Sequence, residues 1–470
     1  MKQDYQRLIS DCAAPWDGEI LEELTAYIKI PNKSPHYDAN WEQNGYMGQA
    51  MAQIAAWCKR QAVKDMQLTV HRLPGRTPLL LLDIPGNTAE TVLLYGHIDK
   101  QPEMRGWDAD KGPWKPLVQD HKLYGRGGAD DGYAVFAAVT AIANLQKHGL
   151  AHARCVVLIE ASEESGSHDL PAYLDLLADQ LGNPQLVVCL DSGCGTYDTL
   201  WSTTSLRGVM SGDLHVKIQK EGIHSGRGSG VIPSWFSVLS EILDRVSDRQ
   251  SGEVTVAACQ TTIPPAVLGQ IDEAAAVLHD HFVEEFPLLP GVQPVNSDRR
   301  QLLINQGWKP MLTVTGIDGI PPLRDAGNVT LPEVSLKLSV RIPPNCDGEK
   351  AMQGFRNALL ENPPFGVKVS VENFEYGSGW QAPALAPWLR AANDTASLAA
   401  FGKKAAYMGE GASIPFMAML GRKFPQAQFL ITGVLGPKSN AHGPNEFLHL
   451  PMAKKLTAAV AIVLNEHARR

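Results

Sequence analysis

Short apolar runs that lead into acidic residues and histidine constrain the fold of this chain more than any other feature. Runs of four or five apolar residues are typical of strands covered on both faces, as in a parallel α/β sheet. The runs, each with the polar residues that follow it, are Val92–Tyr95 with His97 and Asp99, Cys155–Ile159 with Glu163 and Glu164, and Leu186–Leu190 with Asp191. Because functional groups in open α/β sheets gather at the carboxyl ends of the strands, we expect these side chains along one edge of one sheet.

The order of the other elements places the outer parts of the chain in the α/β class. A helix is expected over 133–147, where apolar residues recur at helical spacing and Gly149 follows. Residues 1–75 are expected to be mainly helical, 428–432 to form a strand and 452–467 to form a closing helix. Alternation of strands and helices predicts a mostly parallel sheet.

A different pattern interrupts this alternation in the middle of the chain. Gly212–Gln219 and Val334–Arg341 alternate polar and apolar residues, as half-exposed strands do, and a helix is expected between them at 235–246. A chain of 470 residues is also too long for one core. The expected domains are a mostly parallel α/β catalytic domain made of 1–205 and 379–470, and an inserted α+β domain with an antiparallel sheet over 206–378.

Two loops add further side chains of the kind that bind metals. Asp130 lies in the glycine-rich turn 125–132, and His442 lies in a loop near the C-terminus. Taken singly, such residues have ordinary explanations: a lone histidine is commonly a satisfied polar residue, adjacent acids commonly form a solvated turn, and Asp130 could cap a helix. Together, acids at the edge of a buried sheet would be uncompensated charges. The set therefore predicts a hydrolytic site with two divalent metal ions, Zn²⁺ first, with Mn²⁺ and Co²⁺ as alternatives.

The same residues form an ordered series of motifs. They are His97-Ile-Asp99, Gly125-Arg-Gly-Gly-Ala-Asp-Asp131, Glu163-Glu-Ser-Gly-Ser167, a strand that ends at Asp191, His224-Ser-Gly226, and Asn440-Ala-His-Gly-Pro-Asn-Glu446. This series resembles the M20 metallopeptidase family, and most closely its carnosinase-like, cytosolic nonspecific dipeptidase branch. The resemblance implies that the inserted block is a lid and dimerisation domain, that the protein is a homodimer, and that the peptide bond between Asp130 and Asp131 is cis.

The resemblance also implies a role for each residue at the predicted sheet edge. The implied metal ligands are His97 and Asp191 for one ion, Glu164 and His442 for the other, and Asp130 as the bridging carboxylate. Glu163 resembles the general base. The residues themselves agree, because two ions need one shared carboxylate, and Asp99 can orient the imidazole of His97 from behind.

Three residues outside the sheet edge complete the predicted site. His224 would be an ordinary loop histidine by itself, but the resemblance implies that it reaches the active site of the other subunit and stabilises the oxyanion. Arg341 would be a surface arginine by itself, but the matching family residue binds the terminal carboxylate of the substrate. Ser413 lies in the segment Gly411–Pro415, which resembles a substrate-binding loop of the family.

Composition narrows the classes of partner. The net charge of −8 argues against a nucleic-acid-binding protein. The sequence has no run close to the ~20 apolar residues of a membrane span, and its polar N-terminus is unlike a signal peptide. Seven scattered cysteines do not form a disulfide framework. We therefore expect a cytoplasmic protein that binds neither nucleic acid nor membranes.

Three functions are compatible with these residues. The first is a two-metal dipeptidase that hydrolyses dipeptides or short peptides with a free C-terminal carboxylate. The second is an N-acyl-amino-acid deacylase on the same scaffold, since both reactions cleave an amide with the same ligands. The third is a catalytically inactive binding protein. The intact ligand set with Glu163 favours an enzyme, and the sequence around His224 together with the long insertion favours the dipeptidase.

Overall fold

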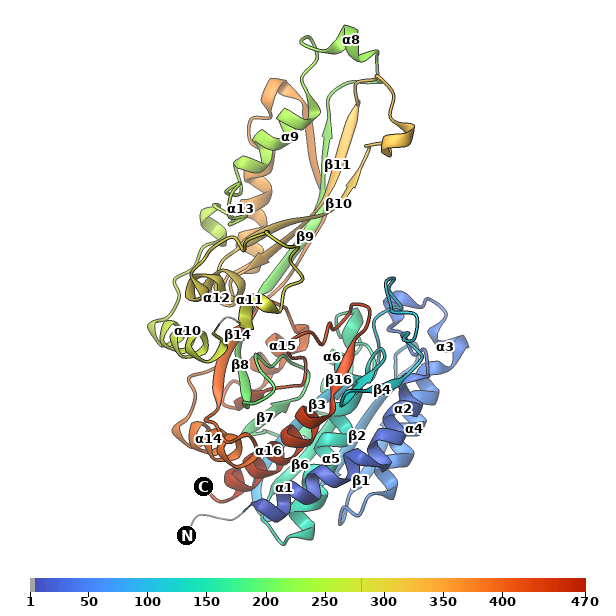
Figure 1. The fold of residues 1–470 in the computed structure, drawn as a ribbon, viewed down its shortest axis with the longest axis vertical. Coiled ribbons are helices and arrows are strands. Elements are labelled where there is room, and N and C mark those ends of the chain that lie inside the picture. Colours follow the sequence, from blue (N-terminus) through green and yellow to red (C-terminus); the bar gives the residue numbers. More distant parts are fainter. Residues whose placement is uncertain (1–4, 280) are drawn as a thin grey trace. The chain divides into compact units, whose positions relative to one another are not determined.

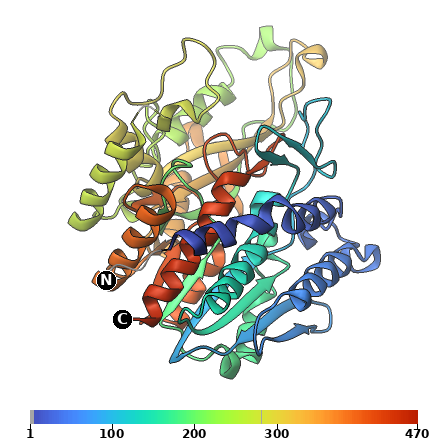
Figure 2. The same cartoon turned by 60° about the horizontal axis from the view of Figure 1, so that its bottom comes forward.

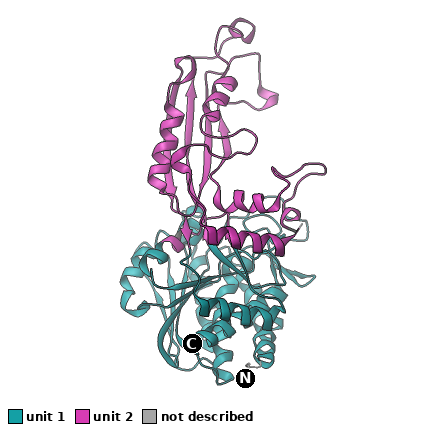
Figure 3. Cartoon of the chain, turned by 90° about the vertical axis from the view of Figure 1, so that its left-hand side faces the viewer, with its two compact units in different colours: residues 1–204, 382–408, 419–470 teal, residues 205–381, 409–418 magenta. Residues whose placement is uncertain are grey.

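The computed structural model describes residues 5–279 and 281–470. The chain divides into two compact units, coloured teal and magenta in Figure 3. Unit 1 comprises residues 1–204, 382–408 and 419–470, and unit 2 comprises residues 205–381 and 409–418. The chain therefore enters unit 2 from unit 1 and returns to unit 1, as an inserted block does.

Unit 1 is built on a six-stranded sheet with the order β1-β2-β6-β3-β7-β15 (Figure 1). The strands are β1 (Gln67–His71), β2 (Leu79–Ile84), β3 (Thr88–His97), β6 (Ala153–Glu160), β7 (Leu186–Cys189) and β15 (Gln428–Ile431). β3 pairs in parallel with β6 and β7, and β7 pairs in parallel with β15. The β1–β2 and β2–β6 pairs are antiparallel. The prediction of a mostly parallel sheet is confirmed.

Helices rich in alanine and other apolar residues pack against this sheet. α5 (Tyr133–Lys147) and α16 (Leu450–Ala468) contact each other and the strands β3 and β6, and most of their residues are buried. Figure 2 shows both helices beside α1 (Gln6–Ala13), which also contacts them. The other helices with residues in unit 1 are α2 (Glu19–Ile28), α3 (Trp41–Asn44), α4 (Tyr46–Arg60), α6 (Leu170–Leu176), α7 (Ala178–Leu181), α14 (Pro387–Phe401) and α15 (Pro415–Lys423).

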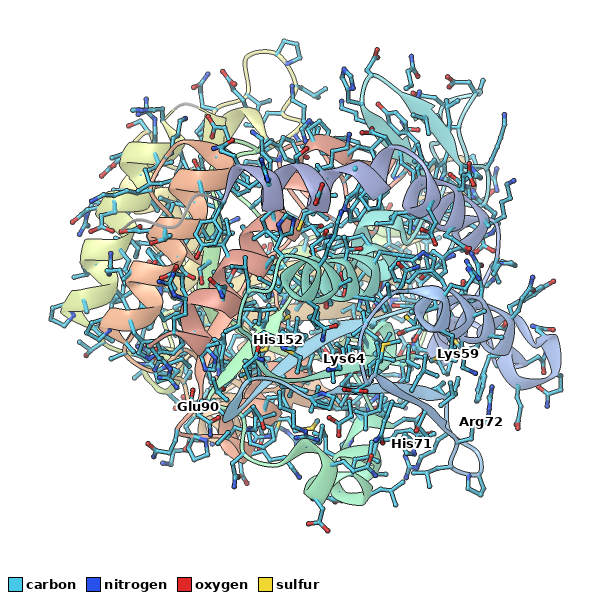
Figure 4. The ribbon with its side chains drawn as sticks, turned by 90° about the horizontal axis from the view of Figure 1, so that it is seen from below. Lys59, Lys64, His71, Arg72, Glu90 and His152 are labelled. Atoms are coloured by element: carbon cyan, nitrogen blue, oxygen red, sulfur yellow. The ribbon has the colours of Figure 1, made fainter. Side chains whose placement is uncertain are left out.

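The two ends of the parallel strands carry different side chains. Figure 4 labels Glu90, near the start of β3, and His152, directly before β6. Both mark the amino end of these strands. His97 is the last residue of β3, so it marks the opposite, carboxyl end. The predicted ligands therefore belong to the carboxyl end of the sheet.

Unit 2 is built on a four-stranded antiparallel sheet with the order β10-β11-β9-β12. The strands are β9 (Gly208–Lys217), β10 (Met311–Asp318), β11 (Glu333–Ile342) and β12 (Lys368–Gly377). Along β9 and β11, buried residues alternate with more exposed ones, as the sequence predicted. The buried side of the sheet packs on α9 (Trp235–Asp244) and α13 (Gly348–Leu360) in one apolar core.

The remaining elements of unit 2 are α8 (Ser225–Gly228), α10 (Pro265–Leu278), α11 (His281–Glu284), α12 (Arg299–Trp308) and β13 (Trp380–Gln381). None of their described residues belongs to that core, and α10 and α12 contact each other. β8 (Trp201–Leu206) and β14 (Ala406–Glu410) run from one unit into the other. Segment 409–418, which carries Ser413, groups with unit 2. The predicted boundaries at 205/206 and 378/379, and the lid and dimerisation roles, stay predictions.

The prediction that residues 1–75 are mainly helical is confirmed. The segment also includes β1, an edge strand without an apolar run that was not predicted. A three-stranded sheet was also not anticipated; its strands are β4 (Leu117–Gln119), β5 (Lys122–Tyr124) and β16 (Phe447–His449). Strands of three residues have too few side chains to show a period. In the described ranges, no helix is long and apolar enough to cross a lipid bilayer.

Candidate metal centre

Two groups of potential ligands meet in unit 1, and both include Asp130. The groups are His97 with Asp130 and Asp191, and Asp130 with Glu164 and His442; within each, the ligand atoms lie within 4.8 Å of one another. His97 Nε2 is 3.4 Å from Asp130 Oδ1, whereas His442 Nε2 is 2.9 Å from Asp130 Oδ2. Each oxygen of the Asp130 carboxylate therefore faces one histidine, which is the arrangement that a carboxylate shared by two ions requires.

Strand order explains why three of these side chains meet. The strands β6, β3 and β7 are adjacent and parallel, so their carboxyl ends lie side by side. His97 ends β3, Asp191 follows β7 closely, and Glu164 follows β6 in the 3₁₀ turn Glu163–Ser165. His97 Nε2 is 3.7 Å from Asp191 Oδ2. The prediction that these residues share one edge of the sheet is confirmed.

Asp130 reaches this edge from the turn before α5. The peptide bond between Asp130 and Asp131 is cis, as the family resemblance implied. Asp131 Oδ2 accepts a hydrogen bond from the backbone N–H of His97 at 3.2 Å, which joins the turn to β3. Only glycine fits at position 96, because a Cβ there would lie 2.7 Å from both the Asp131 carboxylate and the Cβ of Ala134.

His442 differs from His97 in its surroundings. The side chain of His97 is 0% exposed, whereas that of His442 is 54% exposed. His442 lies in a loop where four non-glycine residues have left-handed φ angles: Lys438, Asn440, His442 itself and Asn445. The first histidine is thus fixed by a buried strand, whereas the second depends on the conformation of an irregular loop.

Asp99 does more than the predicted orientation of one imidazole. Its Oδ1 lies 3.4 Å from His97 Nδ1. Its two carboxylate oxygens accept hydrogen bonds from the backbone N–H groups of Glu163 and Glu164, at 3.0 and 2.9 Å. The backbone carbonyl oxygen of Asp99 lies closer to His97 Nδ1, at 3.1 Å. Asp99 is completely buried, so this one residue holds both the His97 ring and the turn that carries the two glutamates.

The acids of the centre strongly perturb one another. Burial and the neighbouring Asp191 raise the pKa of Glu163 well above its usual value, and burial and Asp130 raise the pKa of Glu164 to about 8. Burial opposes ionisation of Asp130 as well, but the neighbouring imidazoles of His442 and His97 hold the pKa of this carboxyl far below its usual value. The same contact with Asp130 raises the pKa of His442 to about 9, against the effect of burial. Divalent cations would relieve this crowding of carboxylates.

An unpartnered nitrogen fits the same conclusion. His97 Nε2 is buried and makes no hydrogen bond among the residues that the structure describes. A buried polar atom without a partner costs free energy unless something binds it. It faces Asp130 and Asp191, so the donor set is one imidazole and two carboxylates, which suits a divalent transition metal. Glu163 lies beside the two ligand groups but belongs to neither.

The structure also brings together two of the predicted substrate-binding residues, in unit 2. Arg341 Nη1 donates a hydrogen bond to Ser413 Oγ at 3.0 Å, and Ser413 Oγ donates to the carbonyl oxygen of Arg207 at 2.6 Å. Burial and the neighbouring Arg341 lower the pKa of Arg207 to about 10. Among the described residues, the guanidinium groups bind backbone carbonyl oxygens and the Ser413 hydroxyl, and neither forms an ion pair with an acid. Two neighbouring guanidinium groups without an acid favour the binding of an anion.

His224 is not part of this arginine cluster. It caps the short helix α8, where its Nδ1 accepts a hydrogen bond from the N–H of Gly226 at 3.0 Å. In the sheet, Arg341 pairs with Val209 near the start of β9, whereas His224 follows the end of that strand. Figure 1 shows α8 beyond the corresponding end of the sheet. Because β9 has ten residues, these two side chains of one chain lie roughly 30 Å apart at about 3.3 Å per residue.

Several contacts at the metal centre could not be anticipated from the motifs. Gln101 Nε2 donates to Glu164 Oε2 at 2.6 Å, which fixes the orientation of that carboxylate. Glu160, at the end of β6, accepts hydrogen bonds from Tyr95 and Ser167 beneath the glutamate turn. Arg126 forms a completely buried ion pair with a residue 320 positions later in the chain, Glu446. The sequence offered one indication of this pair, because Arg126 and Glu446 both belong to the quoted motifs.

Sequence comparison places this geometry in a family. The sequence profile described as Peptidase family M20/M25/M40 matches residues 93–466, which is more than half of the chain. The chain belongs to peptidase family M20. This assignment confirms the resemblance stated from the motifs.

Relatives of this M20 peptidase include dipeptidases. The cysteinylglycine-S-conjugate dipeptidase of Corynebacterium striatum is 26% identical over 450 residues, covering 92% of this chain and 93% of the relative. The Cys-Gly metallodipeptidase DUG1 of Saccharomyces cerevisiae is 25% identical over 371 residues, covering 75% of this chain and 76% of the relative. The crystal structure of human carnosine dipeptidase 1 matches with a TM-score of 0.77 at 19% identity, covering 99% of each chain. The last comparison confirms the predicted fold class, an α/β domain with an inserted α+β domain.

Proposed function

We propose that this M20 peptidase hydrolyses the amide bond of dipeptides, or of short peptides with a free C-terminal carboxylate, with the help of two divalent metal ions. The observation that carries the proposal is the position of Asp130, whose two oxygens each face one group of potential ligands. The dipeptidase relatives support the choice of substrate class.

The residues would divide between the two ions as follows. His97 and Asp191 hold one ion, Glu164 and His442 hold the other, and Asp130 is shared. Zn²⁺ suits these ligands first, and Mn²⁺ and Co²⁺ are the alternatives. When bound, the ions polarise the scissile carbonyl group and lower the pKa of the attacking water.

Glu163 would act as the general base of this reaction. It takes the proton of the attacking water and later returns it to the nitrogen of the leaving amine. Asp99 supports the reaction from behind, because it holds the backbone of Glu163 and the ring of His97 at the same time.

Arg341 would bind the terminal carboxylate of the substrate through its guanidinium group. Ser413 accepts a hydrogen bond from one Arg341 nitrogen, so the guanidinium plane is held while its other N–H groups stay available to a ligand. This role distinguishes a peptidase for free C-termini from an enzyme that accepts any amide. The N-acyl-amino-acid deacylase alternative is not favoured, since the relatives described above are dipeptidases.

The proposal extends to a homodimer formed through the inserted domain, residues 206–378. Exposed apolar side chains support it: β10 is an edge strand of the unit 2 sheet, and its Val314 and Ile317 are 44% and 55% exposed. Leu323, which follows β10, is 98% exposed. In such a dimer His224 would complete the active site of the partner subunit. We also propose a cytoplasmic location, in keeping with seven buried cysteines that form no disulfide.

A substrate panel tests the function. The metal-free protein is loaded with Zn²⁺, Mn²⁺ or Co²⁺ and assayed with a dipeptide, the same dipeptide amidated at its C-terminus, and an N-acyl-amino acid. We expect hydrolysis of the free dipeptide to exceed that of both other substrates. Preferred hydrolysis of the N-acyl-amino acid would show that the deacylase function is the correct one, and no hydrolysis with any metal would leave only a binding role.

Subunit exchange tests the role of His224. His224→Ala and Glu163→Gln homodimers should each be nearly inactive. Mixed and exchanged, they should regain activity, because a heterodimer has one site in which both groups are intact. If tagged pull-down confirms heterodimers and activity stays at the level of the parent variants, the shared-site proposal is wrong.

A further inference from the structure

The position of His442 raises the question of what fixes its loop. Its ring is 54% exposed, and its backbone and that of three neighbours adopt left-handed φ angles. Non-glycine residues adopt such angles at a cost, and only where surrounding contacts hold them there. His442 Nε2 nevertheless lies 2.9 Å from Asp130 Oδ2. Some contact must therefore hold this exposed loop in register with the turn that carries Asp130.

Arg126 makes that contact, since its guanidinium group binds the His442 loop and the segment at Pro102 at once. Nη2 donates to the carbonyl oxygens of His442 and Gly443, both at 3.0 Å. Nε donates to the carbonyl oxygen of Pro102 at 3.2 Å, close to the His97–Asp99 segment. Nη1 donates to Glu446 Oε2. Arg126 itself belongs to the turn 125–132, so its side chain joins this turn to the His442 loop.

Glu446 closes the connection from the other side. Its second carboxylate oxygen accepts a hydrogen bond from the N–H of Gly127 at 2.8 Å, and its backbone carbonyl accepts from the N–H of Gly125 at 3.0 Å. Glu446 is 0% exposed and the Arg126 side chain is 1% exposed. The loop that carries His442 and the turn that carries Asp130 thus share four polar contacts and one buried ion pair.

Stability alone does not account for this pair. Removing two charges from water costs about as much as their attraction returns, so a buried ion pair contributes little more than a well-packed apolar pair would. What an apolar pair lacks is direction. A planar guanidinium with five donors fixes several acceptors at defined angles, which the single ammonium group of lysine does not.

We propose that Arg126, paired with Glu446, is a positioning residue that sets the distance between His442 and the bridging Asp130, and so determines the affinity of one of the two metal sites. The other site takes His97 and Asp191 from the ends of buried strands, and the hydrogen bond from the His97 N–H to Asp131 joins the turn that carries Asp130 to β3. We therefore expect this site not to depend on the pair. The inference rests on the two-metal site of the proposed function. It goes beyond that function because it predicts that one ion can be weakened selectively by a residue that touches neither ion.

The test is a Co²⁺ titration of the metal-free protein, followed by calorimetry and by the visible absorption of bound Co²⁺. Arg126→Lys keeps the charge but loses the fork to the two carbonyl groups. We expect it to bind one ion as the wild type does and the second about 10–100-fold more weakly, the usual effect of outer-sphere variants. His442→Ala is the reference and should show the same selective loss.

Arg154→Lys is the matched control, because it makes the same substitution in another arginine of unit 1. Arg154 pairs with Asp83 through two hydrogen bonds, at 2.9 and 2.6 Å. It lies near the amino end of β6, roughly 20 Å from the carboxyl end at about 3.3 Å per residue. This variant should bind both ions as the wild type does. If Arg126→Lys does not fold, Glu446→Gln carries the same test, since it removes the charge that holds Arg126.

The outcomes separate the positioning role from the proposed function. If His442→Ala weakens one ion and Arg126→Lys binds both normally, the positioning role is wrong and the metal site stands. If Arg126→Lys weakens both ions equally, the residue has a general structural role and the inference is also wrong. If His442→Ala binds both ions like the wild type, the assignment of the metal site itself fails.

Discussion

The candidate metal centre in unit 1 and the arginine cluster in unit 2 each carry an excess of charge, and the two excesses have opposite signs. In unit 1, carboxylates from three other segments crowd around Asp130, and among the described residues the imidazoles of His97 and His442 oppose them. In unit 2, Arg207 and Arg341 lie together, with a serine hydroxyl and backbone carbonyl groups as their hydrogen-bond partners. The first region therefore favours the binding of cations, and the second favours the binding of an anion.

Compensated pairs elsewhere in unit 1 make the contrast clearer. Arg154 is matched by Asp83, and Arg126 by Glu446. These pairs connect segments of the fold and leave no charge for a ligand. The difference teaches that a partly or fully buried charged group indicates a binding site here only where its counter-charge is missing. Each variant below removes one charged group, either from a region with an excess of charge or from an ion pair.

The largest effect is expected for Asp130→Ala. Because one carboxylate faces both ligand groups, its loss should release both metal ions together and abolish activity. Elemental analysis after gel filtration measures the ions that remain. One ion still bound at a stoichiometric level would show that Asp130 belongs to a single site.

Glu163→Gln should lower turnover nearly as much as Asp130→Ala does, but it should leave both metal ions bound. The substitution keeps the size of the side chain but removes the base, whose contribution is typically about 10²–10⁴-fold. Steady-state kinetics and elemental analysis on the same sample check both parts. Loss of metal in this variant, or turnover close to the wild type, would contradict the role given to Glu163.

Arg341→Met should mainly raise KM, and only for substrates with a free C-terminus. A charge-assisted pair with a carboxylate contributes about 1.5–3 kcal/mol, so KM should rise about 10- to 150-fold. For the C-terminally amidated dipeptide the change should be small. An equal effect on both substrates would mean that the arginine cluster does not bind the terminal carboxylate.

The smallest effect is expected for Arg154→Met, because Arg154 forms an ion pair that is partly exposed to water. The substitution breaks the pair with Asp83; the side chains of Arg154 and Asp83 are 28% and 31% exposed. The free energy of unfolding should fall by only about 0.2–1 kcal/mol, with unchanged metal content and kcat/KM. Chemical denaturation measures the change. A loss of metal in this variant would remove the distinction between compensated and uncompensated groups.

Much of the fold was predictable because its central elements have a strong period. α5 begins and ends at the predicted residues, and β6, β7 and β11 agree to within a few residues. These elements bury most of their side chains or bury every second one, which the sequence displays directly. β1 and the three-residue strands β4, β5 and β16 were not predicted, because edge strands and very short strands bury too few side chains to show a pattern.

The site divides in the same way. His97, Asp191 and Glu164 were predictable because each follows an apolar run, and parallel strands bring such residues together. The ion pair between Arg126 and Glu446 was not, since the two residues are 320 positions apart and a charged residue in a glycine-rich turn is usually exposed. Contacts of this kind depend on how distant loops fold onto one another, which no local pattern records.

The most direct test of the central claim is the position of the metal ions themselves. Crystals of the protein loaded with Zn²⁺ would be measured on both sides of the zinc absorption edge. We predict two anomalous peaks per subunit, about 3.5–4 Å apart, with one oxygen of Asp130 bound to each. A single peak, or two peaks of which only one contacts Asp130, would contradict the account.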